Sequence, residues 1–378
     1  MSRKFLLLCI LVFSATLSAP AQEKSKLAQF GLKMLASVTE PNKNLDSAYV
    51  LQPRLKWMVA VEGNTIHTAV DLHSDLTLSD FSGDKTSVTQ GTMDLGMTNN
   101  LYKKVGLSAG YGSLGAGFGV ELGKKRTDRN TYFSLGSMGT FYGFSVQYYK
   151  THQDVTGRLE LGEYASYGLS SEYPGEMRNL SLTGYYAFNR NRFVLESAYS
   201  GRPLQRRSCG SWLVTAKYMQ GDFSINPDDV VLTSLLNDLH RYATWQLSFG
   251  GGYSFNWVLF HKDPVDYDNW KGLRNLTLNA TLQPMVSFFN HIDTEQGEGA
   301  AVKKVRYQGP PTITPAALGA VCYAWGRYFL TVQASYSRFN LNGVDTHVEE
   351  EGGLFRTKVS TQGVFHDLSA KMKFGVRF

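Results

Sequence analysis

The sequence ends with Leu368-Ser-Ala-Lys-Met-Lys-Phe-Gly-Val-Arg-Phe378, in which apolar and polar side chains alternate strictly. Successive side chains of a β-strand point to opposite faces, so this alternation predicts one apolar face and one charged face. Such a pair of faces over about ten residues is typical of a transmembrane β-strand, with lipid outside and a watery lumen inside. The ending therefore predicts an all-β fold, a transmembrane antiparallel up-and-down β-barrel.

The apolar face of this stretch ends on an aromatic residue. Phe374, Val376 and Phe378 resemble the signal by which the outer-membrane barrel assembly machinery recognises its clients. We predict that these three residues are an assembly signal. Closure of a barrel also requires the last strand to pair with the first one.

The first 21 residues have the organisation of a secretory signal peptide. Arg3 and Lys4 precede an apolar run over residues 5–13, and small residues follow up to Ala21. This run is much shorter than the roughly twenty residues of a membrane-spanning helix. We predict cleavage after Ala21 and export to the cell outer membrane of a Gram-negative bacterium.

Composition agrees with an exported barrel. No apolar stretch of about eighteen residues follows the signal peptide, while the 37 Gly, 21 Tyr and 22 Phe are many. The net charge of +6 falls to +4 without Arg3 and Lys4, which is too low to indicate nucleic-acid binding. An oxidising envelope would permit a disulfide between Cys209 and Cys322, but two cysteines make no framework and we favour free thiols.

The mature chain divides into an N-terminal segment, 22–53, and a barrel, 54–378. Within the segment, residues 24–38 have the apolar spacing of a short amphipathic helix that Pro41 ends. This helix could lie on the periplasmic surface of the membrane, plug the barrel or tether the first strand, and the sequence does not choose among these alternatives. For the barrel we count about twelve strands, with ten or fourteen as alternatives, because bacterial barrels close on even numbers. An even number places both termini on the periplasmic side.

Several expectations concern the connections. A turn is expected at Gly63-Asn64, and a bulge or a tight turn near Gly112-Ser113. Asn189-Arg-Asn191 predicts a hairpin whose second strand contains Phe193 and Tyr199. Longer polar segments are predicted to be external loops. They span 75–85, 152–175, 221–241 with a short helix over 229–239, 263–269, 293–311 and 345–353.

No sequence pattern indicates catalysis or a cofactor. Gly110-Tyr-Gly-Ser-Leu-Gly115 matches a dinucleotide fingerprint by its letters, but a strand pattern follows where a helix is needed. The eight His lack the close spacing of zinc ligands. There is no Gly-x-Ser-x-Gly elbow, although a barrel can bring Ser, His and an acid together from distant strands. We predict no catalytic, metal-binding or cofactor-binding residues.

One basic cluster lies near the predicted hairpin and contains Arg190, Arg192, Arg206 and Arg207. Arginine forms strong charge-assisted hydrogen bonds with phosphate, so these residues are candidate contacts for lipid phosphates or an anionic solute. Solvated turns and strand ends are the simpler interpretation, which we favour.

Two segments carry a resemblance to a known family. Tyr185-Tyr-Ala-Phe-Asn-Arg-Asn-Arg-Phe193 and Arg207-Ser-Cys-Gly-Ser-Trp-Leu213, with Asp46-Ser-Ala-Tyr-Val50 and the Phe378 ending, resemble the domain of unknown function 4421 family. The resemblance covers most of the mature chain. It implies an uncharacterised outer-membrane β-barrel of the Bacteroides group and supplies no catalytic residue or ligand.

These observations predict a monomeric, porin-like outer-membrane barrel of unassigned molecular function. It would be a narrow channel or a barrel that holds a small solute. The alternatives are an outer-membrane hydrolase of lipid or peptide, and a structural or surface-binding barrel that acts through external loops. The expected partners are outer-membrane lipids and the barrel assembly machinery, with no nucleic acid.

Overall fold

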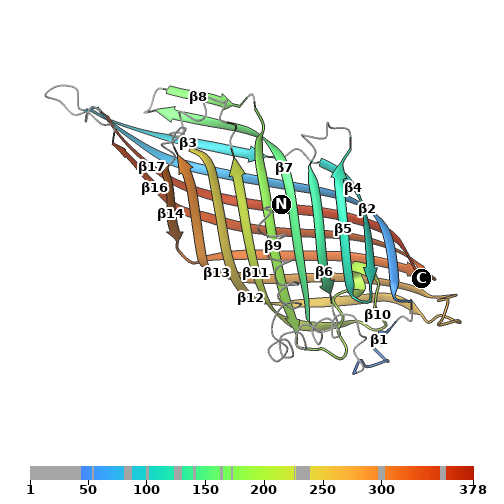
Figure 1. Ribbon diagram of the computed structural model, residues 1–378. Helices are drawn as coiled ribbons and strands as arrows, with labels where there is room; N and C mark the ends of the chain where they lie inside the picture. Colours follow the sequence, from blue (N-terminus) through green and yellow to red (C-terminus); the bar gives the residue numbers. More distant parts are fainter. Residues whose placement is uncertain are drawn as a thin grey trace, which may run out of the picture.

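The computed structural model describes residues 44–52, 55–80, 87–98, 102–122, 130–138, 142–161, 165–171, 173–224, 226, 239–296, 303–349 and 355–378. These residues form a closed antiparallel β-barrel (Figure 1). The predicted signal peptide, the predicted amphipathic helix over 24–38 and nearly all of the helix predicted over 229–239 lie outside the described residues. Among the described helices, none is long and apolar enough to cross a membrane.

Twelve strands close the barrel, which confirms the predicted number. In the order of the chain they are β2 (Trp57–Asp80), β4 (Tyr102–Tyr111), β5 (Leu114–Glu121), β6 (Thr131–Met138), β7 (Tyr142–Leu161), β9 (Gly175–Ala187), β11 (Cys209–Ser224), β12 (Leu239–Lys262), β13 (Arg274–Gln296), β15 (Thr312–Trp325), β16 (Tyr328–Glu349) and β17 (Phe355–Arg377). The last strand pairs with the first over its full length, from Phe355↔Asp80 to Arg377↔Met58. The terminal strand therefore closes the sheet, as its alternation predicts.

Three further strands lie toward the end of the barrel opposite to Phe378, here called the distal end; the other is the C-terminal end (Figure 1). They are β3 (Ser87–Thr98), β8 (Ala165–Ser170) and β14 (Lys303–Gly309). Strand β3 pairs with β2 on one side and directly with β7 on the other. Since β3 thereby bypasses β4, β5 and β6, fewer strands surround the interior at the distal end.

The predicted turns have mixed outcomes. The turn at Gly112-Ser113 is confirmed and joins β4 to β5, with Gly112 at a φ of 59°. The turn at Gly63-Asn64 is wrong, because β2 continues through both residues and pairs with β17 on one side and β4 on the other. The predicted hairpin after β9 is also wrong. The chain leaves the sheet there, and residues 193–199 contain no strand.

The described parts of most predicted external loops are strands instead. Residues 75–80, 152–161, 165–170, 293–296, 303–309 and 345–349 continue the ladders of β2, β7, β8, β13, β14 and β16. Of 221–241, residues 221–224 belong to β11 and 239–241 to β12. Backbone pairing needs no apolar face, so polar strands extend the sheet beyond its apolar part. Residues 263–269 do connect two strands, but at the C-terminal end of the barrel, where Gly326 N donates a hydrogen bond to Leu273 O.

The outer surface is apolar and is edged by aromatic and charged residues. On β17, Met372, Phe374 and Phe378 are 55%, 50% and 52% exposed, whereas Arg377 on the opposite face is buried. Aromatic rings pair around the C-terminal end, for example Trp212 with Tyr253 at 5.2 Å. Distally the apolar surface gives way to ion pairs between strands, such as Lys150 Nζ–Glu176 Oε2 at 2.5 Å and Arg241 Nη2–Asp222 Oδ2 at 2.6 Å. This pattern suits a lipid-facing belt.

Polar side chains fill the interior beside β11, β12 and β13. Asn279 Nδ2 donates to Asn256 Oδ1 at 2.8 Å, and Gln283 Nε2 donates to Thr215 Oγ1 at 2.9 Å. The hydroxyls of Ser254 and Thr281 lie 2.6 Å apart. These buried groups hydrogen-bond to one another, so side chains fill this side of the lumen.

Candidate functional site: a luminal chamber

Residues 188–208, here called the plug, connect β9 to β11 and fold into the C-terminal end of the barrel. The plug contains the one-turn helix α3 (Ser197–Ser200) and strand β10 (Leu204–Gln205), which pairs with β1 (Val50–Leu51). Phe193, Val194 and Leu204 are completely buried. Side chains that point inward from the wall hold its backbone: Asn256 Nδ2 donates to Val194 O at 2.8 Å, and Gln333 Nε2 donates to Tyr199 O at 2.7 Å. The plug therefore closes this end of the lumen.

Two buried arginines attach the plug to the ends of the barrel wall. Arg202 donates hydrogen bonds to Lys56 O at 2.6 Å and to Gly112 O, at the start of β2 and at the β4–β5 turn. From the last strand, Arg377 Nη2 donates to Gly201 O at 2.9 Å. Gly201 has a φ of 62°, a left-handed conformation that costs glycine little. The plug is thus bonded to both strands whose pairing closes the barrel.

Glu196 is a buried carboxyl group of the plug. Burial raises its pKa to about 8, although the nearby Arg202 and a hydrogen bond from Ser200 Oγ at 2.9 Å act in the opposite direction. A carboxyl group in this environment is mostly protonated at neutral pH.

Apolar side chains close the interior on the distal side. This distal apolar cluster consists of Ile66, Val70, Met93, Leu95, Met97, Tyr132, Tyr149, Val155, Leu159, Met177, Met219, Phe223, Tyr242, Ile292 and Phe365. They come from strands on all sides of the barrel, including β3, β7, β11 and β17. Because the interior of a small barrel is narrow enough for side chains to fill, the cluster blocks the route along the barrel axis.

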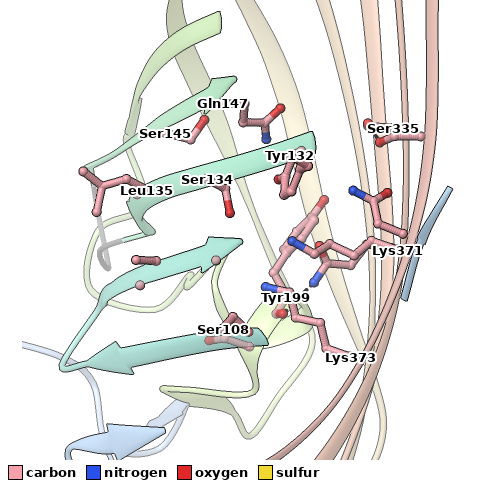
Figure 2. Close-up of a pocket in the computed structure, with 18 of the residues that line it drawn as sticks. Ser108, Tyr132, Ser134, Leu135, Ser145, Gln147, Tyr199, Ser335, Lys371 and Lys373 are labelled. Carbon is pink, nitrogen blue, oxygen red and sulfur yellow. Dashed lines mark hydrogen bonds between the residues drawn. The ribbon is translucent and has the colours of Figure 1, made fainter. Parts of the chain in front are cut away.

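A chamber of about 200 Å³ remains between the plug and the distal apolar cluster. The wall formed by β4–β7 contributes small side chains, with Ser108, Ser134 and Ser145 among them. Lys371 and Lys373 reach toward this wall from β17, and Tyr199 of the plug lies beside them (Figure 2). Hydroxyl, amide and ammonium groups therefore surround the space.

The two lysines share one carboxylate. Lys371 Nζ lies 3.0 Å from Glu62 Oε2 and Lys373 Nζ lies 3.8 Å from the same atom. Glu62 faces Lys373 directly across the β2–β17 ladder that closes the barrel. The side chains of Lys371 and Lys373 are 12% and 18% exposed, whereas that of Glu62 is 1% exposed. The ammonium groups, and not the carboxylate, are presented to the chamber.

Several buried polar atoms beside the chamber lack a hydrogen-bond partner among the described residues. They are Asn64 Oδ1, Ser108 Oγ and Glu196 Oε2, and all three residues line the space. An unsatisfied buried polar group costs about 1–3 kcal/mol. The lining is therefore suited to a polar occupant.

The four arginines of the predicted basic cluster lie at the C-terminal end and outside the chamber. Arg192 Nε donates to Asp46 Oδ2 at 3.1 Å, and Arg206 donates to Asp263 and, at 2.5 Å, to Ser47 O. Arg207 lies over the ring of Tyr49 at 5.9 Å, and Arg190 is exposed. Three of the four thus contact the N-terminal residues 44–52, and contacts of this cluster with lipid phosphates stay a prediction.

The predicted assembly signal lies on the outer face of β17. Phe374 and Phe378 are exposed and Val376 is half-buried. Cys209 and Cys322 are free thiols, as predicted. The sequence had placed Lys371 and Lys373 only on a charged face, and it did not single out Glu62. The alternation of the last strand indicates that both lysines point into the lumen. Their common partner, Glu62, cannot be predicted in this way, because it meets them only when the first and last strands pair.

A family model for a domain of unknown function (DUF4421) matches residues 70–359, more than three quarters of the chain. The chain belongs to this family. DUF4421 carries no assigned activity, which agrees with the prediction of an unassigned molecular function. No curated protein matches the chain.

Solved structures similar to this DUF4421 chain include three bacterial proteins. One is a FadL homologue of Pseudomonas aeruginosa, with 10% identity, coverage of 84% of this chain and 90% of that one, and a TM-score of 0.19. The toluene transporter TodX of P. putida has 6% identity, coverage of 84% of this chain and 90% of that one, and a TM-score of 0.18. Outer-membrane expressed OmpT of Vibrio cholerae has 10% identity, coverage of 82% of this chain and 98% of that one, and a TM-score of 0.18. Scores this low carry no argument about the site.

Proposed function

We propose that this protein is an outer-membrane β-barrel that holds a small polar solute in its lumen and does not let solutes diffuse freely through it. The chamber of about 200 Å³ between the plug and the distal apolar cluster carries this proposal. A general diffusion pore needs a continuous watery path, whereas both ends of this lumen are filled by packed side chains. The apolar outer belt supports the membrane location.

The C-terminal end would face the periplasm and the distal end the outside, with the protein acting as a monomer. Outer-membrane lipids would surround the apolar belt, and the exposed Arg190 and Arg207 suit phosphate groups at its periplasmic edge. The face formed by Phe374, Val376 and Phe378 would engage the barrel assembly machinery.

Binding without chemistry is favoured over hydrolysis. A serine hydrolase needs a histidine that hydrogen-bonds to the nucleophile. No histidine is among the described residues that line the chamber. We therefore propose that the chamber binds a solute without hydrolysing it.

Reconstitution in planar bilayers tests the closed lumen. The full chain should give no steady conductance. Replacement of residues 192–206 by a Gly-Ser linker of equal length should not open a path by itself, because the distal apolar cluster still blocks the barrel axis. Equilibrium dialysis of the purified protein against neutral sugars, polyols, amino acids and hydroxylated acids tests the holding role. Steady conductance of the unaltered chain, or binding of none of these solutes, would overturn the proposal.

A further inference from the structure

The charges around the chamber do not balance. Lys371 and Lys373 share the single carboxylate of Glu62, so one positive charge remains within a nearly buried site. An uncompensated buried charge is expensive, and a bound anion would remove this cost.

The other charged groups that line the chamber do not supply the missing negative charge. Asp367 interacts with Lys217 and Lys104, two buried cations of its own, and accepts a hydrogen bond from Tyr149 OH at 3.2 Å. Glu196, with its raised pKa, is largely protonated at neutral pH. The third cation of the lining, Arg202, is engaged with two carbonyl groups of the wall. The region around the two lysines therefore stays positive.

The wall opposite the lysines is shaped for hydroxyl groups. Ser108, Ser134 and Ser145 present hydroxyls, each of which can donate one hydrogen bond and accept others. Gly117 leaves space beside these hydroxyls, since a Cβ at this position would lie 3.0 Å from both Glu62 Oε1 and Ser134 Oγ. The volume is below the roughly 300–1,000 Å³ of sites for drug-sized ligands, so the occupant is no larger than a monosaccharide.

We infer that the chamber binds a small hydroxylated carboxylate, with its carboxylate between Lys371 and Lys373 and its hydroxyl groups against the serines of the β4–β6 wall and β7. This rests on the proposed function, because it names the class of solute that the closed lumen holds. The ammonium groups of the two lysines supply the charge-assisted hydrogen bonds, which are about twice as strong as neutral ones.

Isothermal titration of the purified full chain in detergent micelles tests the inference. The probes are glycolate, D-gluconate and D-glucuronate, each compared with its neutral methyl ester, together with D-glucose. At least one acid should bind about tenfold or more tightly than its ester. Lys371→Met and Lys373→Met should each weaken that acid about tenfold. Lys103→Met is the matched control, because Lys103 is exposed on β4, and it should leave binding within about twofold.

The outcomes separate the inference from the proposed function. If D-glucose or the esters bind as well as the acids, or if the lysine variants bind the acids unchanged, the inference is overturned while a solute-holding barrel stands. If neither acids, esters nor any solute of the wider panel binds, both fail. The comparison of acid with ester uses the unaltered protein, so it decides the matter even where a lysine variant does not fold.

Discussion

Replacing Arg202 with methionine should release the plug. The substitution keeps an unbranched apolar stem but removes the donors to Lys56 O and Gly112 O. Hydrogen bonds to charged groups contribute about 1.5–3 kcal/mol each, which gives about 3–6 kcal/mol for the pair. The buried guanidinium no longer has to be desolvated in the variant, so we adopt the lower value, about 3 kcal/mol. The population with a displaced plug should then rise about a hundredfold.

Limited proteolysis measures this change, because a displaced plug exposes residues 188–208 to cleavage. Arg190→Met is the control, since Arg190 is exposed near the start of the plug, and it should behave as the parent does. If Arg202→Met gains no cleavage in the plug, the arginine does not hold the plug in place.

Three further changes test other parts of the structure. Gly201→Ala should lower the midpoint of thermal unfolding, because the added Cβ would lie 2.5 Å from Arg377 Nη2 on a residue with a φ of 62°, at a cost of about 2–4 kcal/mol. Gly168→Ala is the control and should leave the midpoint unchanged, because no atom lies within 4 Å of its added Cβ. Equal midpoints for the two variants would contradict this prediction. The pKa of Glu196 in the folded protein, about 8, exceeds its ordinary value of 4.5, so plug docking should weaken as the pH rises from about 4.5 to 8 and then stay constant. Glu196→Gln should flatten the pH dependence of plug proteolysis over that range. An unchanged pH dependence in the variant would mean that another group causes it. Deletion of Phe378 should impair membrane insertion, seen as less protein in the outer-membrane fraction, and normal insertion would refute the assembly signal.

Alternation predicted the barrel because one face of each wall strand meets a different solvent from the other. Phe374 lies outside and Lys373 inside, as their sequence phase requires. Alternation cannot predict a strand where both of the strand's faces carry polar side chains. Residues such as those of 303–309 pair as strands through their backbone, and their side chains give no signal that distinguishes them from a loop.

The plug was mistaken for a strand because its apolar residues repeat at intervals of two. Phe193, Leu195 and Tyr199 follow that pattern, but all residues of 193–200 are buried, which no wall strand shows along the residues whose burial is described. Burial on every side is a property of the surrounding barrel and leaves no trace in a local pattern. The partnership of Glu62 with Lys371 is hidden for a related reason, since it exists only after the first and last strands have paired.

The attachments of the plug couple its docking to closure of the barrel. Arg202 reaches the start of β2, and Arg377, the last residue of β17, reaches the plug at Gly201. Both attachments therefore form together only when β2 and β17 are paired and the plug is in place. Thermodynamic coupling of this kind is reciprocal, so plug docking stabilises closure of the β2–β17 seam by the same free energy by which closure stabilises docking. The seam also aligns Glu62 with Lys373, and loss of the plug should thus disturb the charged side of the chamber as well as uncover it.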